Sequence, residues 1–276
     1  MSLFIASLNS GSNGNCYYVG NESEAVLVDA GISCRETEKR MANLNLQMER
    51  VKAIFISHEH GDHISGLPAL SKKYRLLVYI TEATLRNSGM ALPHHLVRHF
   101  STQPVSIGAL RVTAFEKLHD AADPYSFVVE GNGIKISVLT DIGKACKQTI
   151  HYFRQCHAVF LESNYDEEML ATGGYPLRLQ KRISGGKGHL SNTQALQLFV
   201  EHRSKYLSHL ILSHLSENNN KPEIVQDLFS PFADEVNIAI ASRYEEGRVY
   251  HIQHTGEDFS SNKNLVPFHT VHYELF

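Results

Sequence analysis

The segment at residues 58–63 has the sequence His-Glu-His-Gly-Asp-His. It follows an apolar stretch of strand length, so that His58 and His60, two residues apart, point to the same side of the chain. Gly61 allows a tight turn, which brings Asp62 and His63 back toward the first two histidines. Neutral imidazoles and carboxylates are suitable ligands for Zn²⁺, Mn²⁺ or Fe, and the segment contains no cysteine. The spacing therefore predicts a site that can hold two adjacent metal ions.

Four further apolar stretches end in an aspartate or a histidine. They are AVLVD, FEKLH, ISVLTD and LILSH, which end at Asp29, His119, Asp141 and His214. A single histidine at the end of a strand is more often a hydrogen-bonded structural residue than a ligand. Together with His58 these ends favour one shared site, because loops at the carboxyl ends of strands converge on one edge of a sheet.

Apolar stretches of strand length alternate with helical stretches, which predicts an α/β chain. The expected strands are residues 3–8, 16–19, 25–28, 51–56, 77–80, 110–115, 125–129, 134–139, 158–161, 210–212 and 236–240. The expected helices are residues 33–44, 67–74, 82–87, 148–155, 175–183, 192–204 and 222–229. The first of these helices begins with a capping box formed by Ser33 and Glu36.

The connections between the expected strands indicate a mixed sheet. The opening strands are close in sequence and joined by turns, and Gly131-Asn132-Gly133 predicts a hairpin between Val129 and Ile134. Part of the sheet is therefore antiparallel. A mixed sheet in two halves fits this order of elements better than a doubly wound parallel sheet.

Composition limits the class of protein. Of the 276 residues, 42% are apolar and 20% are charged, which is enough apolar material for a large core. The formal charge of −3 argues against a protein that coats nucleic acid over its whole surface, although a local basic groove is compatible with it. The four cysteines lack paired CxxC spacing and are expected to be reduced thiols. No long apolar segment or secretory signal is present, so no membrane contact and a cytoplasmic location are expected.

The pattern HxHxDH at residues 58–63 resembles that of the metallo-β-lactamase-fold hydrolases. The resemblance implies an αββα sandwich over roughly residues 1–252, within a hydrolase domain of residues 1–256; residues 257–276 are expected to be a C-terminal tail with no assigned function. It implies that His58, His60 and His119 bind a first metal ion and that Asp62, His63 and His214 bind a second. It also implies that Asp141 bridges the two ions, and that Asp29 orients a ligand without binding metal.

The charge of such a site suggests its substrate. Two divalent cations balanced by Asp62, Asp141 and one hydroxide leave about one positive charge, which favours an anionic group such as a phosphodiester. A neutral lactam or lactone remains compatible with this charge.

Two glycine-rich segments could bind phosphate through backbone N–H groups. The first is residues 10–16, where Ser10, Ser12 and Asn15 are candidate substrate contacts; taken alone, this segment is more typical of an ordinary turn. The second is residues 185–192, where Lys187, Ser191 and Asn192 are candidates. Either Ser191 or Asn192 is expected to cap the helix that follows.

A basic helical face precedes the second glycine-rich segment. Arg178, Lys181 and Arg182 are spaced i, i+3, i+4 and therefore share one face of the expected helix 175–183. Most charged faces of this kind are only solvated. The position of this one just before His189 favours a phosphate-binding face.

Motifs along the whole chain resemble a narrower branch, the YycJ/WalJ-like proteins. In order they are SGSNGNC, SHEHGDH, HDAADP, LTDIG, ESNYDEEML, GYP, GHLSN and SHLSENN. This resemblance implies a 5′ to 3′ exonuclease that acts on DNA. GHLSN is also similar to the HST loop of the tRNA 3′-processing nucleases, which implies that His189 assists the leaving group and acts with Asp62 and Asp141 in catalysis.

Several related classes are excluded. The stretch between Asp141 and His214 is too short for the inserted domain of the β-CASP nucleases, the chain start lacks the export signal of true β-lactamases, and the helical substrate domain of glyoxalase II is not apparent.

Two alternatives remain open. One is a phosphodiesterase for small cyclic phosphates or nucleotides, which would not need the basic face. The other is a di-iron redox or binding module, for which no flavodoxin-like partner domain is present.

Overall fold

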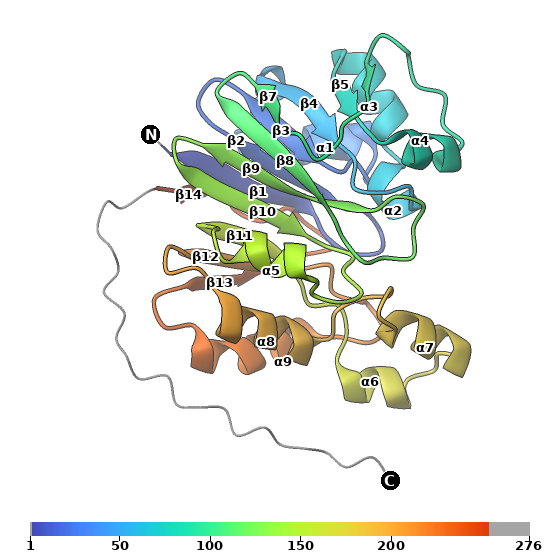
Figure 1. Cartoon of the computed structure of the whole chain (residues 1–276), viewed down its shortest axis with the longest axis vertical. Helices are drawn as coiled ribbons and strands as arrows, with labels where there is room; N and C mark the ends of the chain where they lie inside the picture. Colours follow the sequence, from blue (N-terminus) through green and yellow to red (C-terminus); the bar gives the residue numbers. More distant parts are fainter. Residues whose placement is uncertain (1, 254–276) are drawn as a thin grey trace.

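The computed structural model describes residues 2–253, in which the chain forms two seven-stranded sheets packed face to face (Figure 1). The first sheet has the strand order β14 (Tyr250–Ile252), β1 (Leu3–Asn9), β2 (Cys16–Gly20), β3 (Ala25–Val28), β4 (Val51–Phe55), β5 (Leu77–Tyr79) and β6 (Val97–Arg98). The second has the order β13 (Asn237–Ile240), β12 (His209–Ser213), β11 (Ala158–Glu162), β10 (Ile134–Leu139), β9 (Tyr125–Gly131), β8 (Leu110–Glu116) and β7 (Val105–Ile107).

Helices cover the outer face of each sheet. The first sheet carries α1 (Cys34–Asn43), α2 (Gly61–Ile64), α3 (Leu67–Tyr74) and α4 (Glu82–Ser88), and the second carries α5 (Lys147–Phe153), α8 (Asn192–His202) and α9 (Pro222–Phe229). Two further helices, α6 (Glu167–Thr172) and α7 (Leu177–Ser184), project at one end of the second half (Figure 1). The expected αββα sandwich of two mixed sheets is confirmed. None of the helices in the described residues has the length and apolar composition needed to span a membrane.

Each sheet is antiparallel in one part and parallel in the other. Strands β14, β1, β2 and β3 pair antiparallel, and β3 to β6 pair parallel. In the second sheet β7 to β10 pair antiparallel and β10 to β13 pair parallel. The expected hairpin is present: Asn132 (φ 54°) and Gly133 (φ 77°) both have positive φ, as a tight turn between twisted strands requires.

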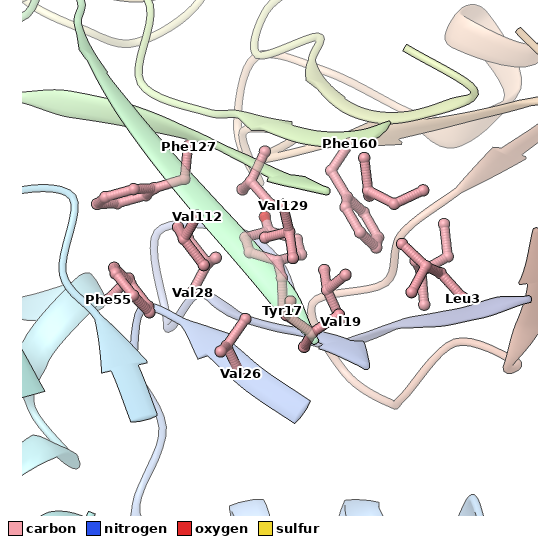
Figure 2. Packing of buried hydrophobic residues seen from close by; sticks show 14 of the residues in the cluster. Leu3, Tyr17, Val19, Val26, Val28, Phe55, Val112, Phe127, Val129 and Phe160 are labelled. Atoms are coloured by element: carbon pink, nitrogen blue, oxygen red, sulfur yellow. The ribbon is translucent and has the colours of Figure 1, made fainter. Parts of the chain in front are cut away.

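The central core lies between the two sheets. Figure 2 shows Val26, Val28 and Phe55 of the first sheet and Phe127 and Val129 of the second within one packed cluster. Two more clusters lie on the outer faces, one between the first sheet and α1 and α3, the other between the second sheet and α5, α8 and α9. Both faces of the central strands are therefore buried, which explains why their sequences are continuous apolar runs rather than alternating ones.

Several predicted elements have the same bounds in the structure, among them α3, α9, β3 and β10. The strands that were not predicted, β6, β7 and β14, are two or three residues long and lie at sheet edges, where too few residues are buried to give a pattern. Helix α6 was also missed, although the Asp166 side chain caps it by accepting a hydrogen bond from the Met169 N–H. The predicted tail, residues 257–276, lies outside the described residues.

Candidate metal centre

Residues from both sheets meet at the edge of the sandwich where the parallel strands end. His58 and His60 follow β4, and His119 follows β8 in the other sheet. Potential ligand atoms of these three side chains all lie within 4.8 Å of one another. The ring centroids are 4.6 Å apart for His58 and His60 and 5.1 Å apart for His60 and His119. The three imidazoles could hold one metal ion.

A second group of three lies beside the first. It consists of Asp62 and His63, from the short helix α2, and His214, which directly follows β12. Asp62 Oδ2 lies 3.3 Å from His63 Nε2 and 3.4 Å from His214 Nε2. This group could hold a second ion.

Asp141 lies between the two groups. Its Oδ2 is 3.0 Å from His63 Nε2, and its Oδ1 is 3.5 Å from His214 Nε2 and 3.8 Å from His119 Nε2. It also forms a potential metal group with His58 and His63. The structure thus brings together all seven residues that the sequence predicts as ligands, with Asp141 between the two groups.

Two buried atoms show that the site fits metal ions. His58 Nε2 and Asp141 Oδ2 are buried and neither makes a well-oriented hydrogen bond within the protein, although Asp141 Oδ2 lies 3.0 Å from His63 Nε2. Burial of a polar atom without a partner is unfavourable, and such atoms in a native structure call for a partner. Imidazole nitrogens and carboxylate oxygens together are a donor set that divalent cations of the Zn²⁺ and Mn²⁺ type accept.

The buried histidines and carboxylates of the site shift one another's pKa values. Burial lowers the pKa of His63, but the adjacent carboxylates, Asp141 foremost, outweigh it and hold that pKa well above its usual value. His214 behaves alike: burial lowers its pKa, yet Asp141 and the other carboxylates raise it to about 10. Burial holds the pKa of His58 well below the usual value. Metal ions bind the deprotonated form of imidazole. Bound cations would therefore replace the protons of His63 and His214 as the positive charges that balance the carboxylates.

Three strand-end residues of the site have left-handed backbone. Asp29, Asp141 and His214 have φ of 62°, 55° and 58°, and each follows a strand by one or two residues. This conformation is uncommon for residues other than glycine, although it is less costly for aspartate and histidine than for bulkier side chains. Each strand therefore turns sharply where its side chain enters the site.

Asp29 supports the first sheet's part of the site from behind. Its Oδ2 lies 2.7 Å from His63 Nδ1 and accepts a hydrogen bond from Ser57 Oγ at 2.9 Å. Ser57 Oγ is in turn 2.8 Å from His58 Nδ1. One carboxylate and one hydroxyl therefore fix the orientation of two imidazoles, and Asp29 itself is not among the groups that could hold metal.

Glu162, which the sequence analysis missed, has the corresponding place in the second sheet. It is the buried last residue of β11, and its Oε1 lies 2.7 Å from His189 Nδ1 and 3.2 Å from His214 Nδ1. Its Oε2 accepts the backbone N–H groups of Ile142 and Leu190. Burial raises the pKa of Glu162, and the adjacent histidines, His189 foremost, outweigh burial and lower it to about 2. The signal in the sequence is weak: a single acidic residue at the carboxyl end of an apolar run, without a second ligand-type residue beside it.

His189 lies at the edge of the centre. Its side chain is 18% exposed, and its ring stacks on that of His214 with centroids 5.3 Å apart. The loop before it contacts the site, since Gly188 O accepts a hydrogen bond from His119 Nδ1 at 3.0 Å. Asp141, Glu162, His189 and His214 also form a group that could hold a cation. Geometry thus places His189 next to the metal groups but leaves it partly open to a substrate.

The basic face of α7 is only partly in contact with the centre. Arg178, Lys181 and Arg182 are all exposed. Arg182 Nε donates a hydrogen bond to Asp120 Oδ2 at 2.5 Å, and Asp120 directly follows His119. Lys187 is exposed as well, and its backbone packs against Gly143, two residues after Asp141.

Four of the predicted substrate contacts are buried in the protein. Ser10 Oγ accepts the His214 N–H at 2.7 Å, and Asn15 Nδ2 donates to Asp62 Oδ2 at 3.1 Å. Ser191 caps α8 in a capping box, and Asn192 Oδ1 accepts a hydrogen bond from Ser163 Oγ. Internal hydrogen bonds occupy these side chains: the first two hold residues of the metal groups and the last two hold the loop before α8. Their contact with a substrate stays a prediction. Ser12 is exposed.

A family model described as "Beta-lactamase superfamily domain" matches residues 24–214, which include all seven ligand-type residues. The chain belongs to the β-lactamase superfamily. Within this superfamily it is 33% identical over 254 residues to exodeoxyribonuclease YycJ of Bacillus anthracis, a match that covers 89% of the chain and 94% of the relative. It is 31% identical over 225 residues to exodeoxyribonuclease WalJ of Streptococcus pneumoniae, covering 79% of the chain and 83% of the relative.

Solved structures support the same superfamily fold. The metallo-β-lactamase-fold protein YhfI from Bacillus subtilis matches 91% of the chain and all of its own length, with a TM-score of 0.69 and 15% identity. At this identity the match concerns the fold alone.

Proposed function

We propose that this member of the β-lactamase superfamily is a metal-dependent phosphodiesterase that degrades DNA from its ends. The observation that carries the proposal is the convergence of His58, His60, Asp62, His63, His119, Asp141 and His214 on one edge of a superfamily fold. The two relatives named exodeoxyribonucleases, which match the chain over most of its length, support DNA as the substrate. We further propose 5′ to 3′ polarity.

We assign His58, His60 and His119 to one divalent ion, Asp62, His63 and His214 to the other, and Asp141 to both. Zn²⁺ or Mn²⁺ suits these donors best, and Fe is compatible with them. When bound by these residues, divalent ions would supply a Lewis acid for the phosphodiester and for water.

The chain's own residues complete the reaction. His189 is assigned as the general acid that gives a proton to the leaving oxygen. With Nδ1 directed at Glu162, its Nε2 is the ring nitrogen that remains for this transfer, and the buried Glu162 carboxylate fixes the orientation of the ring. Arg182, at the end of α7 next to the centre, and Lys187 are assigned to the phosphates of the strand, with Arg178 and Lys181 farther along the same surface.

The test compares four substrates with metal-reconstituted protein: a 5′-phosphorylated DNA duplex, the single strand, an RNA of the same sequence and a cyclic nucleotide. We expect mononucleotides from the linear DNA and no cleavage of a closed circle, with label at the 5′ end released first. The His58→Ala variant serves as the control for contaminating nuclease. Hydrolysis of the cyclic nucleotide without any cleavage of DNA would overturn the proposal in favour of a small-molecule phosphodiesterase.

A further inference from the structure

A cavity of about 310 Å³ adjoins the metal centre on the side of β12 and β13. Its lining includes Ser10, Leu215, Glu217, Arg243 and Tyr244. Leu215 directly follows His214, and Ser10 Oγ accepts the His214 N–H, so that the wall of the cavity is continuous with one of the assigned ligands. None of the residues assigned to metal binding or proton transfer lines it.

Arg243 in this cavity has hydrogen-bonding capacity that the protein does not use. Its side chain is 14% exposed, and its Nε and Nη1 are buried without a hydrogen-bond partner. Its Nη2 contacts Glu217 Oε2 at 3.2 Å, and the Glu217 side chain is 53% exposed. Among the arginine and lysine side chains of residues 2–253, Arg243 is the one with buried, unpartnered nitrogens. A guanidinium presents five N–H donors in a rigid plane, and an anion is the ligand that such donors bind most strongly.

The loop that carries Arg243 is held in place from three sides. Ser10 N donates to Ser242 O, Asn13 Nδ2 donates to Arg243 O at 2.8 Å, and Arg40 Nη2 from α1 donates to Tyr244 O at 3.0 Å. The backbone that carries Arg243 is therefore anchored to the loop at residues 10–13 and to α1. Tyr244 follows it with a side chain 72% exposed, an unusual arrangement for a large aromatic residue. Exposed aromatic rings beside a basic group are a common platform for an unstacked base.

We propose that the Arg243 cavity binds the terminal phosphate of the DNA strand, with Tyr244 against the base of the end nucleotide. The inference rests on the proposed function, which it deepens by naming how the enzyme recognises an end. A terminal phosphomonoester carries more negative charge than an internal diester, so a partly buried guanidinium favours it. The small cavity accommodates an end rather than a continuing duplex. The polarity assigned above makes this the 5′-phosphate.

The test measures kcat/KM on oligonucleotides that carry a 5′-phosphate, a 3′-phosphate or only hydroxyl ends. Wild type should prefer the 5′-phosphate, and Arg243→Gln should lose about 10- to 100-fold on that substrate, the range of a charge-assisted hydrogen bond, while changing less than about twofold on hydroxyl ends. Arg243→Lys should be intermediate, and Tyr244→Leu should raise KM. Arg248→Gln is the matched control, because it makes the same charge change at an exposed position five residues further along the chain. A preference for the 3′-phosphate that Arg243→Gln abolishes would support the cavity and reverse the polarity.

Equal losses on phosphorylated and hydroxyl ends would overturn the assignment, as would a wild type that does not distinguish them. Failure of the proposed function gives a different result: a nitrophenyl phosphodiester is hydrolysed, but no oligonucleotide is. In that case calorimetric titration of thymidine 5′-phosphate into metal-loaded protein tests the cavity alone, and equal affinity of wild type and Arg243→Gln would overturn it. Thermal unfolding of each variant verifies that it is folded.

Discussion

In the first sheet the ligand-type side chains come from one short segment, residues 58–63, whereas in the second they come from strand ends that lie far apart in the sequence, at His119, Asp141 and His214. Each sheet adds one buried carboxylate behind the histidines, Asp29 in the first and Glu162 in the second. The positions of the first group follow from one strand end and one short helix, β4 and α2. The second part depends on the registers of several strands. Of the two carboxylates, only Glu162 also contacts His189. Substitutions of Asp29 and Glu162 should therefore separate effects on metal binding from effects on catalysis.

Asp141→Asn should have the largest effect, because Asp141 lies between the two groups of ligands. The amide keeps the shape of the side chain but removes the charge that two cations share, so activity should fall to background. Elemental analysis should give about two metal ions per wild-type chain and fewer in the variant. His95→Ala, which changes an exposed histidine, should keep both ions and full activity. A wild type that saturates at one ion would contradict the two-metal centre.

His189→Ala should lower kcat by roughly 10² to 10⁴, the usual cost of losing a positioned proton donor, with two metal ions and KM nearly unchanged. A nitrophenyl phosphodiester has a leaving group that needs no proton, so its hydrolysis should suffer much less. Steady-state kinetics on the two substrates provide the measurement. If both rates fall equally and metal is lost, His189 is a ligand, as its place in the group with Asp141, Glu162 and His214 allows.

The carboxylates behind the histidines test the comparison of the two sheets directly. Asp29→Asn and Glu162→Gln should each weaken metal binding about 10- to 100-fold. Only Glu162→Gln should also lower kcat at saturating metal, because Glu162 contacts His189 as well as His214. Metal titration against a competing chelator, followed by kinetics at saturation, separates the two effects. A lower kcat in metal-saturated Asp29→Asn would contradict the proposed difference, in which Asp29 affects metal binding alone and Glu162 also affects catalysis.

Replacement of Arg178, Lys181 and Arg182 by glutamate should have the smallest of these effects, since all three are exposed. Metal content should not change, DNA binding should weaken at least about tenfold, and the slope of log K against log salt should fall by about one for each lost phosphate contact. Fluorescence anisotropy at several salt concentrations measures this slope. An unchanged KM on long duplex DNA would show that the face is only solvated.

The sequence was sufficient for the elements whose signals are local. Strand and helix patterns gave β3, β10, α3 and α9 with their observed bounds, and the strand-end rule brought together His58, His119, Asp141 and His214. Edge strands of two or three residues, such as β6, were not predicted, because their pairing is decided by neighbours distant in sequence.

Side-chain roles that depend on the third dimension were harder to predict. Ser10 and Asn15 lie in a glycine-rich loop typical of phosphate binding, but in the structure their polar atoms are used by His214 and Asp62. Glu162 was missed because a glutamate in an apolar strand carries no spacing pattern, and its two histidine partners lie 27 and 52 positions further along the chain. Arg243 was missed because burial of its nitrogens is visible only in the fold.

The left-handed backbone at Asp29, Asp141 and His214 restricts which residues can evolve at these positions. Such a backbone costs a non-glycine residue roughly 1 kcal/mol, and β-branched side chains are nearly excluded from it. Glycine would relax each turn, so a His214→Gly chain without metal should gain local backbone stability while losing a ligand. Backbone conformation and side-chain role therefore place opposite demands on these three strand ends: the backbone favours glycine, whereas the site requires a carboxylate or an imidazole.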